Sequence, residues 1–273
     1  MERLHGDRWF YHPSRQVYAH PADFDLAYES VFFDAKDAAL GGNAAEGKLH
    51  GWFFPAKIQP KGTVIHCHGN AGNITSHFQF VAWMPAYGWN VFCFDYRGFG
   101  RSPGCPSRPG TIDDARAAIH YVASRDDVDA ARLVLFGQSL GGAVGIVAAA
   151  DRGDLRGVAV EGAFCDYRRE AAYVCKRSLI LWGVASPVSR LLIQPGYDPI
   201  DYVGKIAPTP TFFVTGTADG ICDPAHTLEL HEAAGDPKSL WVIGGGRHTS
   251  AIIETDGEGP RRFDAFFSAC VEG

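Results

Sequence analysis

Short apolar runs recur along the chain, and segments with helical spacing lie between most of them. Six runs are apolar on both faces, namely GTVIHCHG, NVFCFDYRG, RLVLFGQS, GVAVEGAF, TFFVTGT and SLWVIGGG. Runs of this kind predict strands that are buried on both sides, as in a parallel sheet covered by helices. The spacing of apolar residues predicts helices over 74–87, 112–124, 140–150, 224–234 and 259–270.

Two further runs, YESVFFDA and KLHGWFFPA, precede the six and have no helical segment between them. They predict an antiparallel pair at one edge of the sheet. The fold class is therefore α/β, with a mostly parallel eight-stranded sheet flanked by helices on both faces. We expect one domain over residues 1–273, with a short helical cap inserted at about 164–208, where the alternation is interrupted.

Composition and charge narrow the range of partners. The 273 residues are 46% hydrophobic and 21% charged, which predicts a large core, and the formal net charge is -6. An acidic chain of this kind lacks the basic surface that nucleic-acid binding requires. We therefore expect no nucleic-acid partner.

The cysteines, the amino terminus and the longest apolar stretch indicate the cellular location of the protein. An odd number of cysteines, seven, without paired spacing predicts reduced thiols in a cytoplasmic protein. No CxxC or HExxH spacing occurs, so we expect no metal. The amino terminus lacks a signal-peptide core, and the longest apolar-leaning stretch, 171–193, carries Lys176, Arg177 and Arg190. We expect no transmembrane segment, while contact with a membrane surface stays open.

The stretch LVLFGQSLGGAVG contains the motif G-x-S-x-G between a predicted strand and a predicted helix. In that context the turn is so tight that its central residue, Ser139, is held at the carboxyl edge of the sheet beside a helix N-terminus. Gly137 and Gly141 keep side chains away from the neighbouring strand and helix. The motif predicts a nucleophilic serine.

A nucleophilic serine needs a base and a residue that orients the base. In open-sheet hydrolases the acid and the histidine follow the serine, each after a later strand. Asp219 follows TFFVTGT and His248 follows SLWVIGGG, so both are expected at the same edge. Asp223 on the same loop and Glu161 at the end of GVAVE remain alternative acids. The less suitable histidines lie within predicted strands or helices or at their ends: His66, His68, His120, His226 and His231.

The segment HCHGNAGN follows a predicted strand and opens a helix. Its glycines allow backbone N–H groups to turn toward the site. We expect the N–H groups of Asn70 and Leu140 to form the oxyanion hole, where such donors stabilise developing negative charge.

Five motifs occur in a fixed order: HGNAGN, DYRGFGRS, GQSLGG, GTADG and GGGRHTS. Together they resemble the α/β-hydrolase superfamily over nearly the whole chain, and HGNAGN with a short cap resembles the branch of alpha/beta-hydrolase-domain depalmitoylases. The resemblance implies that Ser139 is the nucleophile, Asp219 the acid and His248 the base. It also implies that DYRGFGRS is structural. In the family, the acid is often followed by a second acidic residue and a valine-proline pair. The acid loop of this chain departs from that pattern, because it reads DGICDP.

These features predict a serine hydrolase that cleaves carboxylic ester or thioester bonds of small-molecule or lipid-like substrates through an acyl-enzyme, without a cofactor. The alternatives are a peptidase or carbon–carbon hydrolase of the same fold, or a non-catalytic small-molecule receptor. In the cap, nine apolar residues are too many for one exposed helix face, and most are expected to pack as core. The hypothesis for the rest is that Trp182 and Leu192 line a substrate pocket above Ser139.

Overall fold

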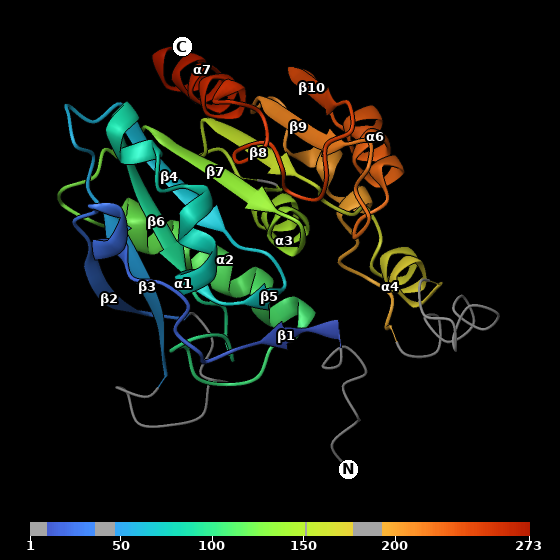
Figure 1. Cartoon of the computed structure of the whole chain (residues 1–273), viewed down its shortest axis with the longest axis horizontal. Helices are drawn as coiled ribbons and strands as arrows, with labels where there is room; N and C mark the ends of the chain where they lie inside the picture. Colours follow the sequence, from blue (N-terminus) through green and yellow to red (C-terminus); the bar gives the residue numbers. More distant parts are fainter. Residues whose placement is uncertain (1–9, 36–46, 151, 177–192) are drawn as a thin grey trace.

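The computed structural model describes residues 10–35, 47–150, 152–176 and 193–273. Its centre is an eight-stranded sheet in the order β10-β9-β8-β7-β4-β6-β3-β2 (Figure 1). The strands are β2 (Glu29–Asp34), β3 (Lys48–Phe54), β4 (Gly62–Cys67), β6 (Trp89–Phe94), β7 (Leu133–Gln138), β8 (Gly157–Glu161), β9 (Thr211–Gly216) and β10 (Lys238–Ile243). Each coincides with a predicted apolar run.

The sheet is antiparallel at one end only. Strand β2 pairs antiparallel with β3, and β3 pairs antiparallel with β6. All other neighbours in the sheet are parallel. The predicted fold class is confirmed, because the antiparallel pair lies at the edge where the chain has no intervening helix.

Successive residues of the central strands alternate between two cores. On β6, Trp89, Val91 and Cys93 pack on one face of the sheet, whereas Phe92 and Phe94 pack on the other. This alternation follows from the period of two in a strand, and it requires helices on both faces. Helices α2 (Arg108–Ala123), α3 (Leu140–Ala149) and α6 (Pro224–Ala233) cover the core that contains Phe92 and Phe94, and α1 (Ile74–His77) and α7 (Glu258–Glu272) cover the other core.

The helix predicted over 74–87 is wrong in its extent. Helix α1 ends at His77, and the chain continues in 3₁₀ turns at Phe78–Phe80 and Met84–Tyr87. Pro85 lies at the start of the second turn. Proline lacks an amide hydrogen and disfavours helical backbone at the residue before it, so a single α-helix cannot run through this segment.

The described part of the predicted cap is α4 (Tyr167–Lys176) and two 3₁₀ turns, Pro199–Asp201 and Val203–Lys205. Trp182 and Leu192 lie outside the described residues, so their place in a substrate pocket stays a prediction. A two-residue parallel pairing of β1 (His12–Pro13) with β5 (Ala71–Gly72), which the sequence did not predict, ties the amino-terminal segment to the loop after β4.

Candidate active site

A cavity of about 310 Å³ opens at the carboxyl ends of the central strands. Four of the residues that line it are predicted site residues: Ser139, His248, Asn70 and Leu140. They come from the loops after β4, β7 and β10, which are far apart in sequence. The parallel topology therefore brings these residues to one edge, as expected for the ends of parallel strands.

Ser139 stands between the last residue of β7 and the first residue of α3. Its backbone has φ 55° and ψ -120°, and its N–H donates to the carbonyl of Glu161 at 2.9 Å. A positive φ is uncommon for a residue with a side chain, and it persists only where the surroundings enforce it. Here the enforced turn directs the hydroxyl into the cavity.

Glycines on either side of Ser139 are required by close backbone contacts. A Cβ atom at Gly141 would lie 1.9 Å from the carbonyl oxygen of Cys67, and one at Gly137 would lie 2.4 Å from that of Gly141. Neither contact leaves room for a methyl group. The helix after the serine thus crosses the end of β4 with no side chain between the two segments.

Asp219 and His248 are joined directly. His248 Nδ1 lies 2.7 Å from Asp219 Oδ2, and Asp219 Oδ1 accepts hydrogen bonds from the N–H groups of Ile221 at 2.8 Å and Cys222 at 3.0 Å. The carboxylate is buried, so its orientation is fixed by two backbone donors. Because a carboxylate only accepts, Nδ1 carries the hydrogen and Nε2 is left free toward the cavity.

The alternative acids are engaged elsewhere. Asp223 caps α6, because its Oδ1 accepts from the N–H of Ala225 at 3.0 Å. Glu161 Oε1 accepts from the N–H of Ala251, and Oε2 accepts from Gln138 Nε2, both at 2.8 Å. Burial raises the pKa of Glu161. Among the described residues, His248 forms its ring contact with Asp219 and with neither alternative.

The Ser139 hydroxyl pairs with Cys222 Sγ at 3.9 Å. No hydrogen bond joins it to His248 in the described part of the chain, although both residues line the same cavity. Catalytic hydrogen bonds are often long in ligand-free enzymes and shorten when substrate binds. The arrangement is therefore compatible with proton transfer between them after a small adjustment.

An oxyanion hole needs backbone N–H groups without an acceptor in the protein, and within the described part of the chain Asn70 and Leu140 each have one. Neither N–H has an acceptor among the described residues, and both residues line the cavity. The Asn70 side chain is held by the amino-terminal segment, since Nδ2 donates to the Phe10 carbonyl at 2.6 Å and Oδ1 accepts from the N–H of His12 at 3.2 Å.

Known proteins are similar to this chain in sequence. A family model described as serine aminopeptidase, S33, matches residues 58–205, which is more than half of the chain. The chain belongs to this family of α/β-hydrolases. It is 36% identical to the uncharacterized protein YfhR of Escherichia coli (strain K12) over 256 residues, 92% of this chain and 82% of that protein.

A plant protein and a solved structure are also similar to this chain. The alpha/beta hydrolase domain-containing protein WAV2 of Arabidopsis thaliana is 30% identical over 81% of this chain and 72% of its own length. The structure of an esterase from Pyrococcus furiosus superposes with a TM-score of 0.74 at 21% identity, covering 96% of this chain and 97% of that one. At that identity the likeness supports the fold of this α/β-hydrolase.

Three further histidines lie on β4, directly after it and at the end of α1. Burial lowers the pKa of His66 to about 3, and its Nε2 lies 3.1 Å from Gln138 Oε1. His68 Nδ1 donates to the Gly69 carbonyl at 2.7 Å. His77, which the sequence analysis did not single out, lines the cavity and donates from Nε2 to the Ala71 carbonyl at 2.6 Å. It stacks on His68 and helps to fix the loop that carries Asn70.

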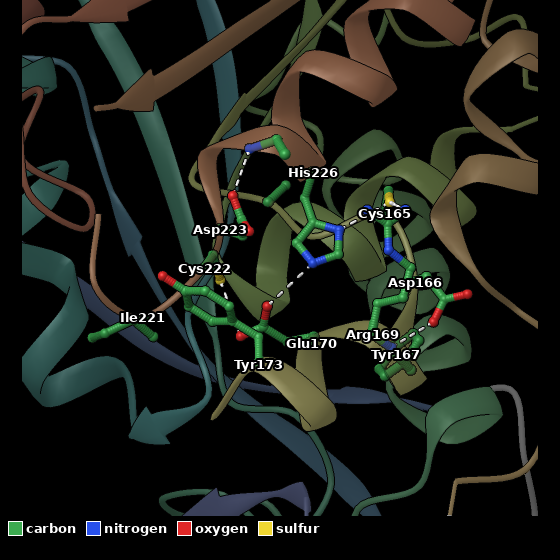
Figure 2. Close-up of polar contacts among 12 residues, drawn as sticks. Cys165, Asp166, Tyr167, Arg169, Glu170, Tyr173, Ile221, Cys222, Asp223 and His226 are labelled. Carbon is green, nitrogen blue, oxygen red and sulfur yellow. Dashed lines mark hydrogen bonds and ion pairs between the residues drawn. The ribbon is translucent and has the colours of Figure 1, made fainter. Parts of the chain in front are cut away.

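A buried carboxyl forms part of the cap side of the cavity. Glu170 on α4 is 4% exposed and lines the cavity. Cys222 Sγ donates to its Oε1 at 3.5 Å, and its Oε2 lies 3.7 Å from His226 Nε2 without a hydrogen bond (Figure 2). Burial raises the pKa of Glu170 to about 8, and the charges of Asp219 and Asp223 act in the same direction. Glu170 is therefore mostly protonated at pH 7.

The contact between Glu170 and His226 is one between two neutral groups. Burial lowers the pKa of His226, whose Nδ1 lies 2.9 Å from Cys165 Sγ. Arg169 donates to Cys165 Sγ at 3.3 Å, and it forms an ion pair with Glu229 at 2.6 Å, where both side chains are partly exposed. We call Cys165, Arg169, Glu170, Cys222, His226 and Glu229 the cap-side network.

The sequence contains a signal for the burial of Glu170, which was not among the predicted site residues. Tyr167, Glu170, Ala171 and Val174 follow the i, i+3, i+4, i+7 spacing of one helix face. A glutamate on an otherwise apolar face indicates a buried carboxyl. Among the described residues, no three potential ligand side chains gather into a metal site, and no helix has the length and apolar character needed to cross a membrane.

Proposed function

We propose that this α/β-hydrolase cleaves carboxylic ester or thioester bonds through an acyl-enzyme on Ser139. The observation that carries the proposal is the 2.7 Å contact of His248 with the buried Asp219 carboxylate, beside a cavity that holds the strained Ser139. In this proposal Ser139 is the nucleophile, His248 the base and Asp219 the residue that orients the base.

The reaction would proceed in two halves. His248 Nε2 takes the proton of Ser139 as Oγ attacks the acyl carbonyl, and Asp219 stabilises the charged imidazole. The N–H groups of Asn70 and Leu140 donate to the oxyanion. His248 then gives its proton to the leaving alcohol or thiol, and it activates the water that releases the acid.

The cavity supports an apolar acyl group. Aromatic and aliphatic side chains line it, namely Phe10, Phe80, Phe164, Ala171, Val174 and Ile221. An aminopeptidase, the activity in the family description, must hold the ammonium group of its substrate. Glu170 carries the single carboxyl among the described lining residues, and burial keeps it mostly neutral at pH 7. Ester or thioester substrates are therefore the better match.

The proposal also covers the domain organisation, the location and the substrate class of the protein. We place one catalytic domain over residues 1–273 with a cap insertion at about 164–208. The seven cysteines form no disulfide, which supports a cytoplasmic location. The resemblance of HGNAGN to the depalmitoylase branch supports acyl thioesters among the proposed substrates.

The experiment combines labelling with turnover. A fluorophosphonate should modify Ser139, as shown by peptide mass spectrometry, and the enzyme should hydrolyse p-nitrophenyl and thioester acyl series faster than the matching anilides. Labelling without turnover would favour a receptor, and faster cleavage of aminoacyl anilides would favour a peptidase. Either result would reject the proposed activity.

A further inference from the structure

A second cavity, of about 220 Å³, lies near the antiparallel edge of the sheet. Its lining includes Arg15, Ser30, His50, Asp95 and Arg101, and it shares no lining residue with the cavity of Ser139. Ser30 lies on the edge strand β2, His50 lies on β3, and Asp95 follows β6. The antiparallel pairing places Ser30 and His50 on adjacent strands.

These three side chains form a continuous hydrogen-bonded relay. Ser30 Oγ lies 3.0 Å from His50 Nε2, and His50 Nδ1 lies 3.1 Å from Asp95 Oδ2. As in His248, Nδ1 of His50 faces a carboxylate. Unlike His248, His50 also contacts a serine hydroxyl, through its Nε2.

The tautomer of His50 follows from counting donors and acceptors. The Asp95 carboxylate accepts from the N–H of Ile74 at 2.9 Å and from the N–H of Arg101 at 3.2 Å. A carboxylate cannot donate, so the hydrogen between it and His50 belongs to Nδ1. In the neutral imidazole, Nε2 must then accept the hydrogen bond of the Ser30 hydroxyl. This is the arrangement that activates a serine.

Burial and charge distinguish the relay from a surface hydrogen bond. His50 and Asp95 are each 1% exposed, whereas Ser30 is exposed, so a buried base faces an accessible hydroxyl. Arg101 Nη1 lies 3.5 Å from Ser30 Oγ, and its guanidinium packs over the ring of Phe32. Arg15 lines the same cavity. Two cations near the hydroxyl favour a substrate with negative charge.

We propose that Ser30, His50 and Asp95 form a second nucleophilic site, which accepts the acyl group of small activated esters that carry a carboxylate. Ser30 Oγ forms a bond to the acyl carbon while its proton passes to His50 Nε2. The bond from the acyl carbon to the leaving oxygen breaks, and that oxygen takes the proton from His50. Arg101 stabilises the oxyanion, and the product is an ester on Ser30.

The test uses the Ser139→Ala protein, so that its outcome does not depend on the function proposed for Ser139. The probes are mono-p-nitrophenyl glutarate, which carries a carboxylate, and the neutral p-nitrophenyl butyrate. Intact mass and peptide mapping measure acylation. The matched control is Ser239, an exposed serine on the opposite edge strand β10, whose hydroxyl contacts the Thr211 carbonyl instead of a histidine.

We expect the glutaryl adduct to form on Ser30 at least tenfold faster than on Ser239. On Ser30 itself, the glutaryl adduct should form faster than the butyryl adduct. Ser30→Ala should remove the adduct, His50→Gln should slow its formation to the rate at Ser239, and Arg101→Gln should remove the preference for glutarate. The thermal transition of each variant shows whether it is folded. An adduct rate on Ser30 equal to that on Ser239, or unchanged in a folded His50→Gln protein, would overturn the proposal. If His50→Gln does not fold, the comparison of the adduct rates on Ser30 and Ser239 keeps the test decisive, because it needs no variant at His50.

Discussion

The two sides of the main cavity are built by different means. On the strand side, backbone groups fix the side chains: the Glu161 carbonyl accepts from the N–H of Ser139, and two N–H groups hold Asp219. On the cap side, contacts among side chains form the cap-side network, including those of Glu170 with Cys222 and His226. Backbone contacts fix geometry, whereas a network of buried side chains changes with protonation and packing. Substitutions should therefore affect rate on the first side, and pH dependence or specificity on the second.

The largest effect is expected at Ser139. Ser139→Ala removes the nucleophile, so kcat for ester substrates should fall by several orders of magnitude while the thermal transition stays close to that of the parent. Initial rates with a p-nitrophenyl ester, together with circular dichroism, measure both quantities. Retained turnover by a folded Ser139→Ala protein would show that the strand side does not carry the chemistry.

The next effect separates two aspartates four residues apart. Asp219→Asn leaves His248 without its anionic partner and should lower kcat by about 10⁴, as in other triads. Asp223→Asn is the matched control, because asparagine caps a helix about as well as aspartate and the change should cost less than about 1 kcal/mol of stability. The measurement is kcat for both variants, and the reverse ranking would assign the role to Asp223.

The pH dependence of folding stability tests the role of Glu170 on the cap side. Its pKa is raised by burial from 4.5 to about 8, so the folded protein holds a proton that the unfolded chain releases. The stability that this proton confers is fully present below pH 4.5 and is lost as the pH rises through about 8. Glu170→Gln cannot ionise, so between pH 5 and 8 its stability should fall less than that of the parent, by on the order of a few kcal/mol.

Urea unfolding of both proteins at several pH values provides the measurement for Glu170. Glu229→Gln is the control, because Glu229 also belongs to the cap-side network but pairs with Arg169, where both side chains are partly exposed. The prediction fails if Glu170→Gln loses stability with pH as steeply as the parent.

The smallest effect concerns the rim of the cavity. Val174 and Ile221 line it and are 50% and 53% exposed, so an acyl chain would cover them. Burial of a methylene contributes about 0.8 kcal/mol, so kcat/KM should rise up to about fourfold per carbon from acetyl to a medium chain. Val174→Asp and Ile221→Asn should flatten that rise, whereas Val242→Asp on β10, outside the cavity, should not. A flat profile in the parent enzyme would reject an acyl groove.

The parts predictable from the sequence are those with a local cause. Period-two and unbroken apolar runs located all eight strands of the sheet, and the pattern around Ser139 indicated its tight turn because the glycines that permit it are neighbours in sequence. The choice between Asp219 and Asp223 remained open, because it depends on which carboxylate the loop turns toward His248. Glu170 with His226, and His50 with Asp95, are contacts between segments distant in sequence. Only the packed fold brings such residues together.

The crossing of Gly141 over the carbonyl of Cys67 has a consequence for directed evolution. Because a methyl group at Gly141 would lie 1.9 Å from that oxygen, libraries that vary this crossing should yield almost no folded clones. The side chain of Val174 on α4 is half exposed, so variation there should be widely accepted. New substrate ranges are thus best sought by recombining cap segments over an unaltered strand edge, and the rate of the chemical step should be inherited with that edge.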